Sequence, residues 1–168
     1  MRHKHRLLVI AVLIAMVLAV PSSAFANKRV WKARLTTGGE LHQVIDSTAR
    51  GTLILATNPD GSFHFILQVR ELSGPVGGAH FHGPADTTQN AAVILPLCGN
   101  PTPSATGAAC PFDNGTLYLE GEITPSLLAA WGLPGGTFFG WLDAGLVYVN
   151  VHTALNPAGE SRGQLAAQ

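Results

Sequence analysis

The sequence predicts an all-β fold, namely an antiparallel, Greek-key-like β-sandwich with one or two short helices. Most segments alternate apolar and polar residues with a period of two, as half-buried strands do. Clusters of Gly, Pro, Asn and Asp separate these segments at short intervals, and only one stretch carries clear helix signals. Short strands, frequent turns and little helix are typical of a sandwich or a barrel.

Residues 1–26 are expected to form a secretory signal peptide, which takes no part in the fold. They combine a basic start, an apolar run from Leu7 to Val20, and the small residues Ala24 and Ala26 before the expected cleavage point. The apolar run is too short to span a bilayer comfortably, and no later segment is long enough to do so. We therefore expect a secreted, periplasmic or extracellular protein with no transmembrane segment after processing. Residues 27–168 are expected to form one domain.

The first half of this domain is expected to contain a strand at residues 31–36 and a hairpin after it. Every second residue from Trp31 to Leu35 is apolar. The runs 52–57 and 63–70 flank the sequence NPDGS, in which the proline fixes one dihedral angle and the glycine supplies a positive φ. These features predict two antiparallel strands joined by a tight turn.

The second half is expected to contain further strands at residues 117–123 and 147–152, where apolar residues again occupy alternate positions. A helix is predicted between them, because Thr124 is a suitable N-cap and Pro125 suits the first helical position. Gly132 is expected to end it. A second helical turn is predicted within FFGWLDAG.

The composition argues against nucleic-acid binding. Three of the ten basic residues lie in the expected leader, so residues 27–168 carry seven basic against ten acidic residues and a formal charge of −3. The clustered Lys and Arg residues that mark nucleic-acid binders are not seen in the sequence.

The two cysteines are expected to form a disulfide. Cys98 and Cys110 bracket a stretch rich in Pro, Gly, Ser and Thr. In an exported protein, two cysteines this close in sequence most often pin a loop. The alternative is that Cys98 is a metal ligand or a nucleophile, but no companion motif supports it.

Three stretches of the chain resemble the CHRD domain, a family named from chordin and found in exported microbial proteins. They are GTLILATNPDGSFHFILQV, leading to GGAHFHGPA, and then GLVYVNVHTALNPAGESRGQL near the end of the chain. The resemblance runs from about Trp31 to Leu165. It implies an exported domain but assigns no activity; in chordin the domain belongs to an extracellular modulator of growth-factor signalling. The chain departs from the family pattern at Ser161, where an aliphatic residue is common, and at ELHQV, so His42 is individual to this protein.

The histidines of the two sharpest motifs predict a metal site. Residues two apart on a strand point to the same face, so His80 and His82 project together. His152, in the second motif, shares a face with Tyr148 and Asn150 opposite a row of valines. If the two strands are neighbours, three imidazoles converge on one polar patch. His42 is a possible fourth ligand.

Such a cluster suits copper, which we favour, or zinc, because imidazole binds either ion and calcium and magnesium prefer carboxylates. The His-x-His strand is also similar, in local pattern and architecture only, to copper-zinc superoxide dismutase. If the site performs redox chemistry, Arg162 is a candidate to attract a small anion. If this segment is extended, Glu160 and Arg162 lie on the same face. A structural alternative is therefore an ion pair between them that holds the final strand in place.

Two functions from different classes follow. The first is a copper-dependent redox or metal-handling protein, with superoxide dismutation as its sharpest version. The second is a non-catalytic extracellular module that presents loops to a protein or matrix partner, with His80, His82 and His152 as polar structural residues. The geometry of the three imidazoles discriminates between them.

Overall fold

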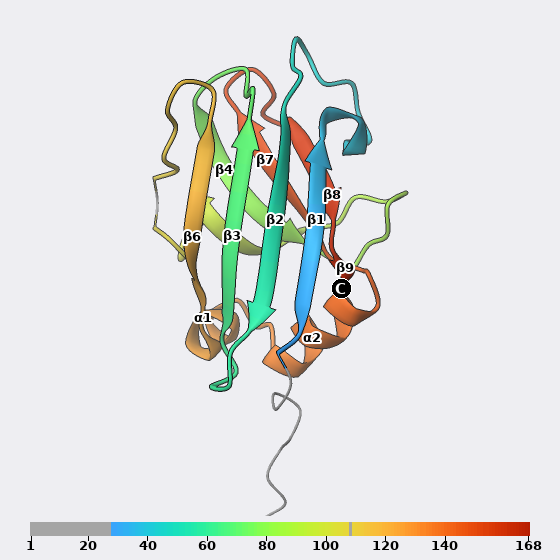
Figure 1. Ribbon diagram of the computed structural model, residues 1–168, viewed down its shortest axis with the longest axis vertical. Helices are drawn as coiled ribbons and strands as arrows, with labels where there is room; N and C mark the ends of the chain where they lie inside the picture. The colour runs from blue at the N-terminus through green and yellow to red at the C-terminus, as the bar shows by residue number, and fades with distance from the viewer. Residues whose placement is uncertain (1–27, 108) are drawn as a thin grey trace, which may run out of the picture.

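The computed structural model describes residues 28–107 and 109–168, which form a two-layered antiparallel β-sandwich with two short helices (Figure 1). This confirms the predicted fold class. The expected signal peptide, residues 1–26, lies outside the described residues.

The first layer contains four strands in the order β6-β3-β2-β1, at the front of Figure 1. They are β1 (Val30–Thr36), β2 (Arg50–Thr57), β3 (Phe63–Arg70) and β6 (Leu117–Ile123). Along β3, Phe63, Phe65, Leu67 and Val69 are buried while the residues between them are partly or fully exposed. The alternation read from the sequence therefore places one face of this layer on the core. Asn58 and Ser62 close the predicted hairpin between β2 and β3.

The second layer contains β5 (Val93–Gly99), β4 (Val76–His82), β7 (Tyr148–Thr153) and β8 (Ser161–Gln164), in that order. β4 and β7 are buried on both faces along almost their whole length. Their inner faces carry Phe81, Val149 and Val151, which pack into the core. Loops cover their outer faces, which carry the polar side chains of the two histidine motifs.

The two layers form one continuous sheet that folds over between β1 and β8, where Thr36 pairs with Arg162. The short strand β9 (Ala166–Ala167) also pairs with β1. At the opposite side, the gap between β5 and β6 is covered by the segment that connects them. Ala105 and Thr106 donate backbone hydrogen bonds to the Pro96 and Leu97 carbonyls of β5. The sheet is thus nearly closed, like a barrel.

The predicted disulfide is present between Cys98 in β5 and Cys110, with the Cα atoms 5.2 Å apart. It fixes the connecting segment against the edge of β5. Because an uncovered strand edge offers free backbone donors and acceptors, the covering segment and the disulfide together protect this edge.

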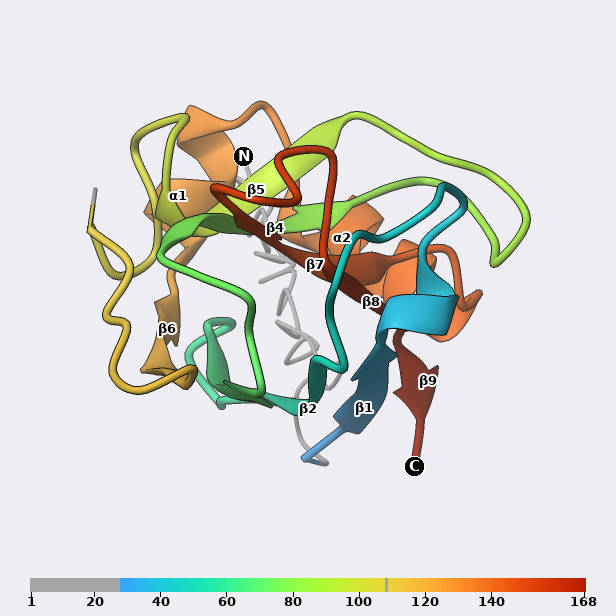
Figure 2. The same ribbon diagram turned by 90° about the horizontal axis from the view of Figure 1, so that it is seen from above.

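Both helices lie at one end of the sandwich, at the bottom of Figure 1 and behind the strands in the view of Figure 2. The predicted helix is α1 (Pro125–Ala130), and the Thr124 hydroxyl accepts a hydrogen bond of 3.1 Å from the Leu127 amide. The second helix, α2 (Gly135–Asp143), starts earlier than the predicted turn. Its Phe138 is buried against Phe63 and Phe81, so α2 closes this end of the core. None of the helices in the described part of the chain is long and apolar enough to cross a membrane.

Candidate metal centre

The fold brings His80, His82 and His152 together on the outer face of the second layer. β4 and β7 are neighbours, with Gly78 paired to His152 and His80 paired to Asn150. One ring nitrogen of each histidine lies within 4.8 Å of the others. The ring centroids are 4.9 Å apart for His80 and His152, and 5.9 Å apart for His80 and His82. The convergence predicted from strand parity is therefore confirmed.

Each of the three rings is held by one hydrogen bond to a backbone carbonyl. His80 Nε2 donates to the Asn100 carbonyl at 2.7 Å, and His82 Nδ1 donates to the Ala91 carbonyl at 2.9 Å. His152 Nδ1 donates to the Pro157 carbonyl at 3.0 Å. A carbonyl only accepts, so these contacts fix which nitrogen of each ring carries the proton.

The second nitrogen of each ring keeps its lone pair. His80 Nδ1, His82 Nε2 and His152 Nε2 are shielded from solvent and have no hydrogen-bond partner among the described residues. A buried polar atom without a partner is costly in a native structure, so three such atoms in one place require an explanation. Metal-binding histidines typically donate their other nitrogen to a carbonyl or a carboxylate, which is the arrangement found at all three rings.

Burial keeps the three imidazoles neutral. It lowers the pKa of His80 to about 4, and the neighbouring His152 adds to this effect while the bond to Asn100 opposes it. Burial is also the main cause that lowers the pKa of His82 and of His152 below the ordinary value. Neutral imidazole is the form that binds a metal ion.

Tyr148 and Asn150 complete the surroundings of the rings. The Tyr148 ring stacks on His82 with centroids 4.8 Å apart and an interplanar angle of 4°. Its hydroxyl also contacts Ala91, accepting from the amide and donating to the same carbonyl that receives the His82 proton. Tyr148 therefore positions His82 in two ways. Asn150 pairs with His80 across the strands, and its buried Oδ1 has no partner among the described residues.

Comparison with protein families shows which family the chain belongs to. The CHRD domain model matches residues 31–165. The chain belongs to the CHRD domain family. No curated protein and no solved structure matches it.

Glu40 is a residue of this CHRD domain that sequence reasoning missed. It follows the short 3-10 helix η2 (Thr37–Gly39) and packs over Gly159, next to the Asn150 amide. Burial raises the pKa of its carboxyl group, while His42, Arg162 and Asn150 act in the opposite direction. The sequence carries no signal for this residue, because its position depends on a loop folding back over the sheet.

Arg162 lies near the site, but its side chain binds a loop. Its guanidinium donates to Asn90 Oδ1 at 2.8 Å and to the carbonyls of Asp86 and Gln89 at 3.0 and 2.8 Å. It also stacks over the Tyr148 ring at 3.5 Å and is 2% exposed. The Arg162 side chain thereby holds the β4–β5 connection, which carries the Ala91 carbonyl that binds His82.

The expected ion pair between Glu160 and Arg162 is wrong. The fully buried Glu160 instead accepts hydrogen bonds from Ser47, Ser73 and Thr153. The physical reason is local: Gly159 has a φ of 134°, and β8 begins only at Ser161, so Glu160 does not follow the alternation of the strand. The two side chains consequently leave the sheet in different directions.

His42 lies outside the three-histidine cluster. Its Nε2 donates to the Gly159 carbonyl at 3.0 Å, and its Nδ1 is 3.9 Å from a Glu40 oxygen. His42 is connected to the site indirectly, through Glu40 and through the turn that precedes β8.

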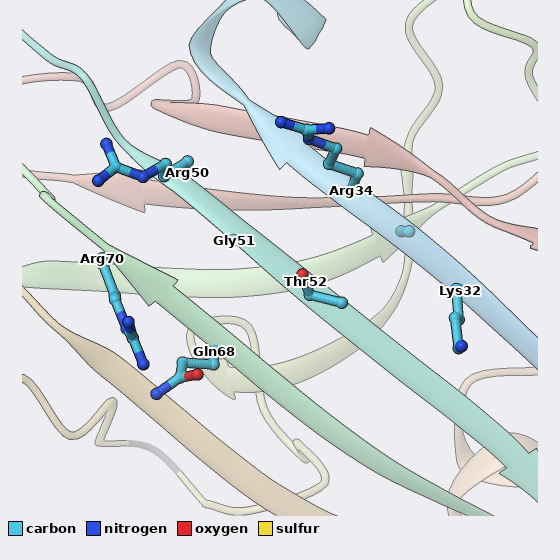
Figure 3. Close-up of a pocket in the computed structure, with 8 residues that line it drawn as sticks. Lys32, Arg34, Arg50, Gly51, Thr52, Gln68 and Arg70 are labelled. Atoms are coloured by element: carbon cyan, nitrogen blue, oxygen red, sulfur yellow. The ribbon is translucent and has the colours of Figure 1, made fainter.

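A basic hollow of this CHRD domain lies on the outer face of the first layer. It has a volume of about 550 Å³ and is lined by Lys32, Arg34, Arg50 and Arg70, together with the neutral residues Thr52 and Gln68 (Figure 3). Arg50 and Arg70 face each other across β2 and β3. The sheet register thus gathers on one face cations that are far apart in the sequence. No histidine, cysteine or carboxylate lines this hollow, so it offers no metal site.

Proposed function

We propose that this CHRD domain binds a transition metal ion, with copper favoured over zinc, through His80, His82 and His152. The observation that supports the proposal is the set of three converging, buried ring nitrogens that have no partner among the described residues, while the opposite nitrogen of each ring is fixed by a carbonyl. Copper is favoured because divalent copper binds nitrogen sites more tightly than zinc does.

The protein groups orient the three rings and supply three nitrogen ligands. Three neutral histidines are fewer ligands than copper or zinc normally takes, so a bound ion keeps a position for water or another ligand. A copper ion held there would supply one-electron redox chemistry. The carbonyls of Asn100, Ala91 and Pro157 keep the rings oriented, and Tyr148 shields one face of His82.

Superoxide dismutation is the specific activity that we propose for the copper-loaded site. Its support is the pair of histidines on one strand and an open metal position. The role of Arg162 as an anion guide finds no support in the contacts of this residue, because three of its N–H groups donate to Asn90, Asp86 and Gln89. We also propose that the protein works outside the cytoplasm, since a disulfide persists in oxidising compartments.

The alternative, a non-catalytic module that presents the loop at residues 99–109 or the Trp131–Trp141 region to an extracellular partner, gains no support from the contacts of these segments. The Cys98–Cys110 segment covers the edge of β5, and the Trp131 indole donates to the Pro103 carbonyl at 2.7 Å. Trp141 and Phe139 pack against the core. These groups are engaged in the fold itself.

The test is a metal titration of the chain with its disulfide intact. We expect one equivalent of copper per chain, with tighter binding than zinc, and loss of that binding in the His80→Ala/His82→Ala variant. The matched control is His42→Ala/His64→Ala, which removes two histidines outside the cluster and should keep the metal. Equal metal content in all three proteins, or no metal in any, would disprove the proposal. A superoxide assay on the copper-loaded protein then tests for superoxide dismutation.

A further inference from the structure

The cations of this chain are concentrated in the basic hollow on the outer face of the first layer (Figure 3). Residues 27–168 contain seven basic residues, and four of them line the hollow: Lys32, Arg34, Arg50 and Arg70. Of the other three, Arg162 is buried and Arg29 pairs with Asp143. None of the acidic residues lines the hollow. A domain with a net negative charge thus carries one strongly positive face.

Three of the four cations in the hollow have no anionic partner. Arg50 forms an ion pair with Glu71, the residue that follows β3. Lys32, Arg34 and Arg70 form no ion pair with any residue in the described part of the chain. Like charges on one face repel each other, and a bound anion relieves that repulsion. The charge of the hollow is therefore complementary to an anionic ligand.

The sheet register spreads these cations along the hollow. Arg34, Thr52 and Gln68 form one row across β1, β2 and β3. Lys32 lies two residues to one side of this row and Arg70 two residues to the other, and Figure 3 shows them on opposite sides of Thr52. From the rise of a strand and the spacing between strands, their Cα atoms are roughly 15 Å apart. An extended ligand with several anionic groups fits this spacing better than a single small anion does.

The lining of the hollow also indicates the chemical class of that ligand. Lysine and arginine only donate hydrogen bonds, whereas the Thr52 hydroxyl and the Gln68 amide both donate and accept. Among the described residues, no aromatic or large aliphatic side chain lines the hollow. Protein partners and bilayers use such side chains as anchors, and single-stranded nucleic acids stack their bases on aromatic rings. A chain of hydroxyl-bearing units with anionic groups needs none of them.

We propose that the basic hollow binds an acidic polysaccharide whose sugars carry carboxylate groups. Carboxylates of the polysaccharide pair with Lys32, Arg34 and Arg70, since a guanidinium matches the geometry of a carboxylate. Sugar hydroxyls between them hydrogen-bond to Thr52 and Gln68. Carboxylates on successive sugars suit cations that are spread along the hollow. The inference is independent of the proposed metal site, which lies on the outer face of the other layer.

The experiment titrates the disulfide-intact protein with oligogalacturonate and follows binding by isothermal titration calorimetry. We expect binding at low ionic strength, and a loss of affinity of at least about tenfold at high salt, because salt screens exposed charges. Four further probes separate this ligand from other classes: a neutral oligosaccharide, a sulfated oligosaccharide, oligoglutamate of the same length, and phosphatidylglycerol vesicles. Each should bind at least about fivefold more weakly than oligogalacturonate.

Two variants test the charge and the shape of the hollow separately. Arg34→Gln/Arg70→Gln removes two cations that have no ion pair and should weaken oligogalacturonate binding by about fivefold or more. Thr52→Leu keeps every cation but fills the centre of the hollow, and it should weaken binding by at least about threefold. The matched control is Lys28→Gln/Arg29→Gln, which removes the same charge just before β1 and should keep the affinity within about twofold.

The inference is wrong if oligogalacturonate does not bind, or if any of the other four probes binds as tightly. An equal loss of affinity in the two double variants, or an unchanged affinity in Thr52→Leu, would reduce the hollow to a non-specific positive surface and would also overturn it. The His80→Ala/His82→Ala variant should bind oligogalacturonate as the native protein does. Failure of this inference would therefore leave the proposed metal site standing, and failure of the metal site would leave this inference standing.

Discussion

Gly78 shows how a single residue without a side chain positions a ligand. A Cβ built on it would lie 2.6 Å from His80 Nε2 and 2.7 Å from the adjacent ring carbon, far closer than van der Waals contact. The His80 ring therefore lies back over the backbone of Gly78, where it reaches the Asn100 carbonyl. At this position the requirement for glycine comes from close approach and not from the backbone angle.

Gly78→Ala should consequently weaken metal binding more than it weakens the fold. The atoms that the new methyl group meets belong to a side chain, so the ring can move and the strand can stay. We expect a loss of at least about tenfold in metal affinity and a change in the free energy of unfolding below about 1.5 kcal/mol. Isothermal titration and urea unfolding measure the two quantities. Gly77→Ala is the control, because its methyl group enters open space, and an equal loss of affinity there would contradict this explanation.

Glu160 is the residue whose charge should govern acid stability. Burial alone would raise its pKa, but hydrogen bonds from Ser47, Thr153 and Ser73 outweigh burial and lower the pKa below the ordinary value of 4.5. The folded chain therefore holds this proton less tightly than the unfolded chain does. The resulting stabilisation is complete above the ordinary value, and it is lost as the pH falls through the lowered value of the folded state.

Glu160→Gln should remove about 2 kcal/mol of stability near neutral pH, since hydrogen bonds to a charged group are replaced by weaker ones. It should also flatten the decrease in stability as the pH falls below about 4.5. Urea unfolding at a series of pH values checks both effects. Glu120→Gln, an exposed carboxylate on β6, serves as the control. An unchanged pH dependence in the Glu160 variant would show that other carboxylates dominate.

At the scale of elements, the β4–β5 connection holds one side of the metal centre although it contributes no ligand. The Ala91 carbonyl orients His82, Tyr148 contacts Ala91, and Arg162 binds Asp86, Gln89 and Asn90. The position of His82 therefore depends on β8, which carries Arg162, through a loop. A change in β8 can alter the site without touching a histidine.

Arg162→Lys tests this dependence. Lysine keeps the charge but cannot reproduce the planar set of donors or the stacking on Tyr148. We expect a loss of about 2–3 kcal/mol in stability and faster proteolysis within residues 83–92. Metal affinity should decrease less than in His82→Ala. Proteolysis unchanged from the native protein would mean that the loop does not need this arginine.

Strands whose sequences alternate apolar and polar residues were predictable from the sequence, and a strand without that alternation was not. β1, β3 and β6 show the period of two together with alternating burial. β7 shows the period in its sequence although it is buried on both faces. β5 was not predicted from the sequence, because its residues, VILPLCG, are almost all apolar and include a proline. This strand is buried from Leu95 to Gly99, so it has no solvent-facing side. Pattern alone does not separate such a run from a buried helix.

The same reasoning explains which parts of the site were predictable. His80, His82 and His152 were found because strand parity controls their direction, and the neighbouring positions of β4 and β7 brought them together. Glu40 was missed and the Glu160 contacts were wrong, because both residues lie in irregular segments where no period applies. Their places depend on long-range contacts between loops.

At the scale of the whole molecule, one disulfide connects the stability of the sandwich with the candidate site. Cys98 pairs with Ala79 across β4 and β5, and it lies two residues before Asn100, whose carbonyl orients His80. The bond to Cys110 also fixes the segment that covers the gap between β5 and β6. Loss of the disulfide should therefore free the edge of the sheet and the end of β5 together.

The Cys98→Ala/Cys110→Ala variant should lose about 2–3 kcal/mol of stability, the amount expected for a cross-link spanning 12 residues. Hydrogen exchange should accelerate at Ala105 and Thr106, whose amides bond to β5, and remain slow in β2 and β3. Because the Asn100 carbonyl becomes less fixed, metal affinity should also decrease, by less than in Gly78→Ala. Exchange that accelerates equally in both layers would show instead that the disulfide stabilises the molecule as a whole, without a special role at this edge.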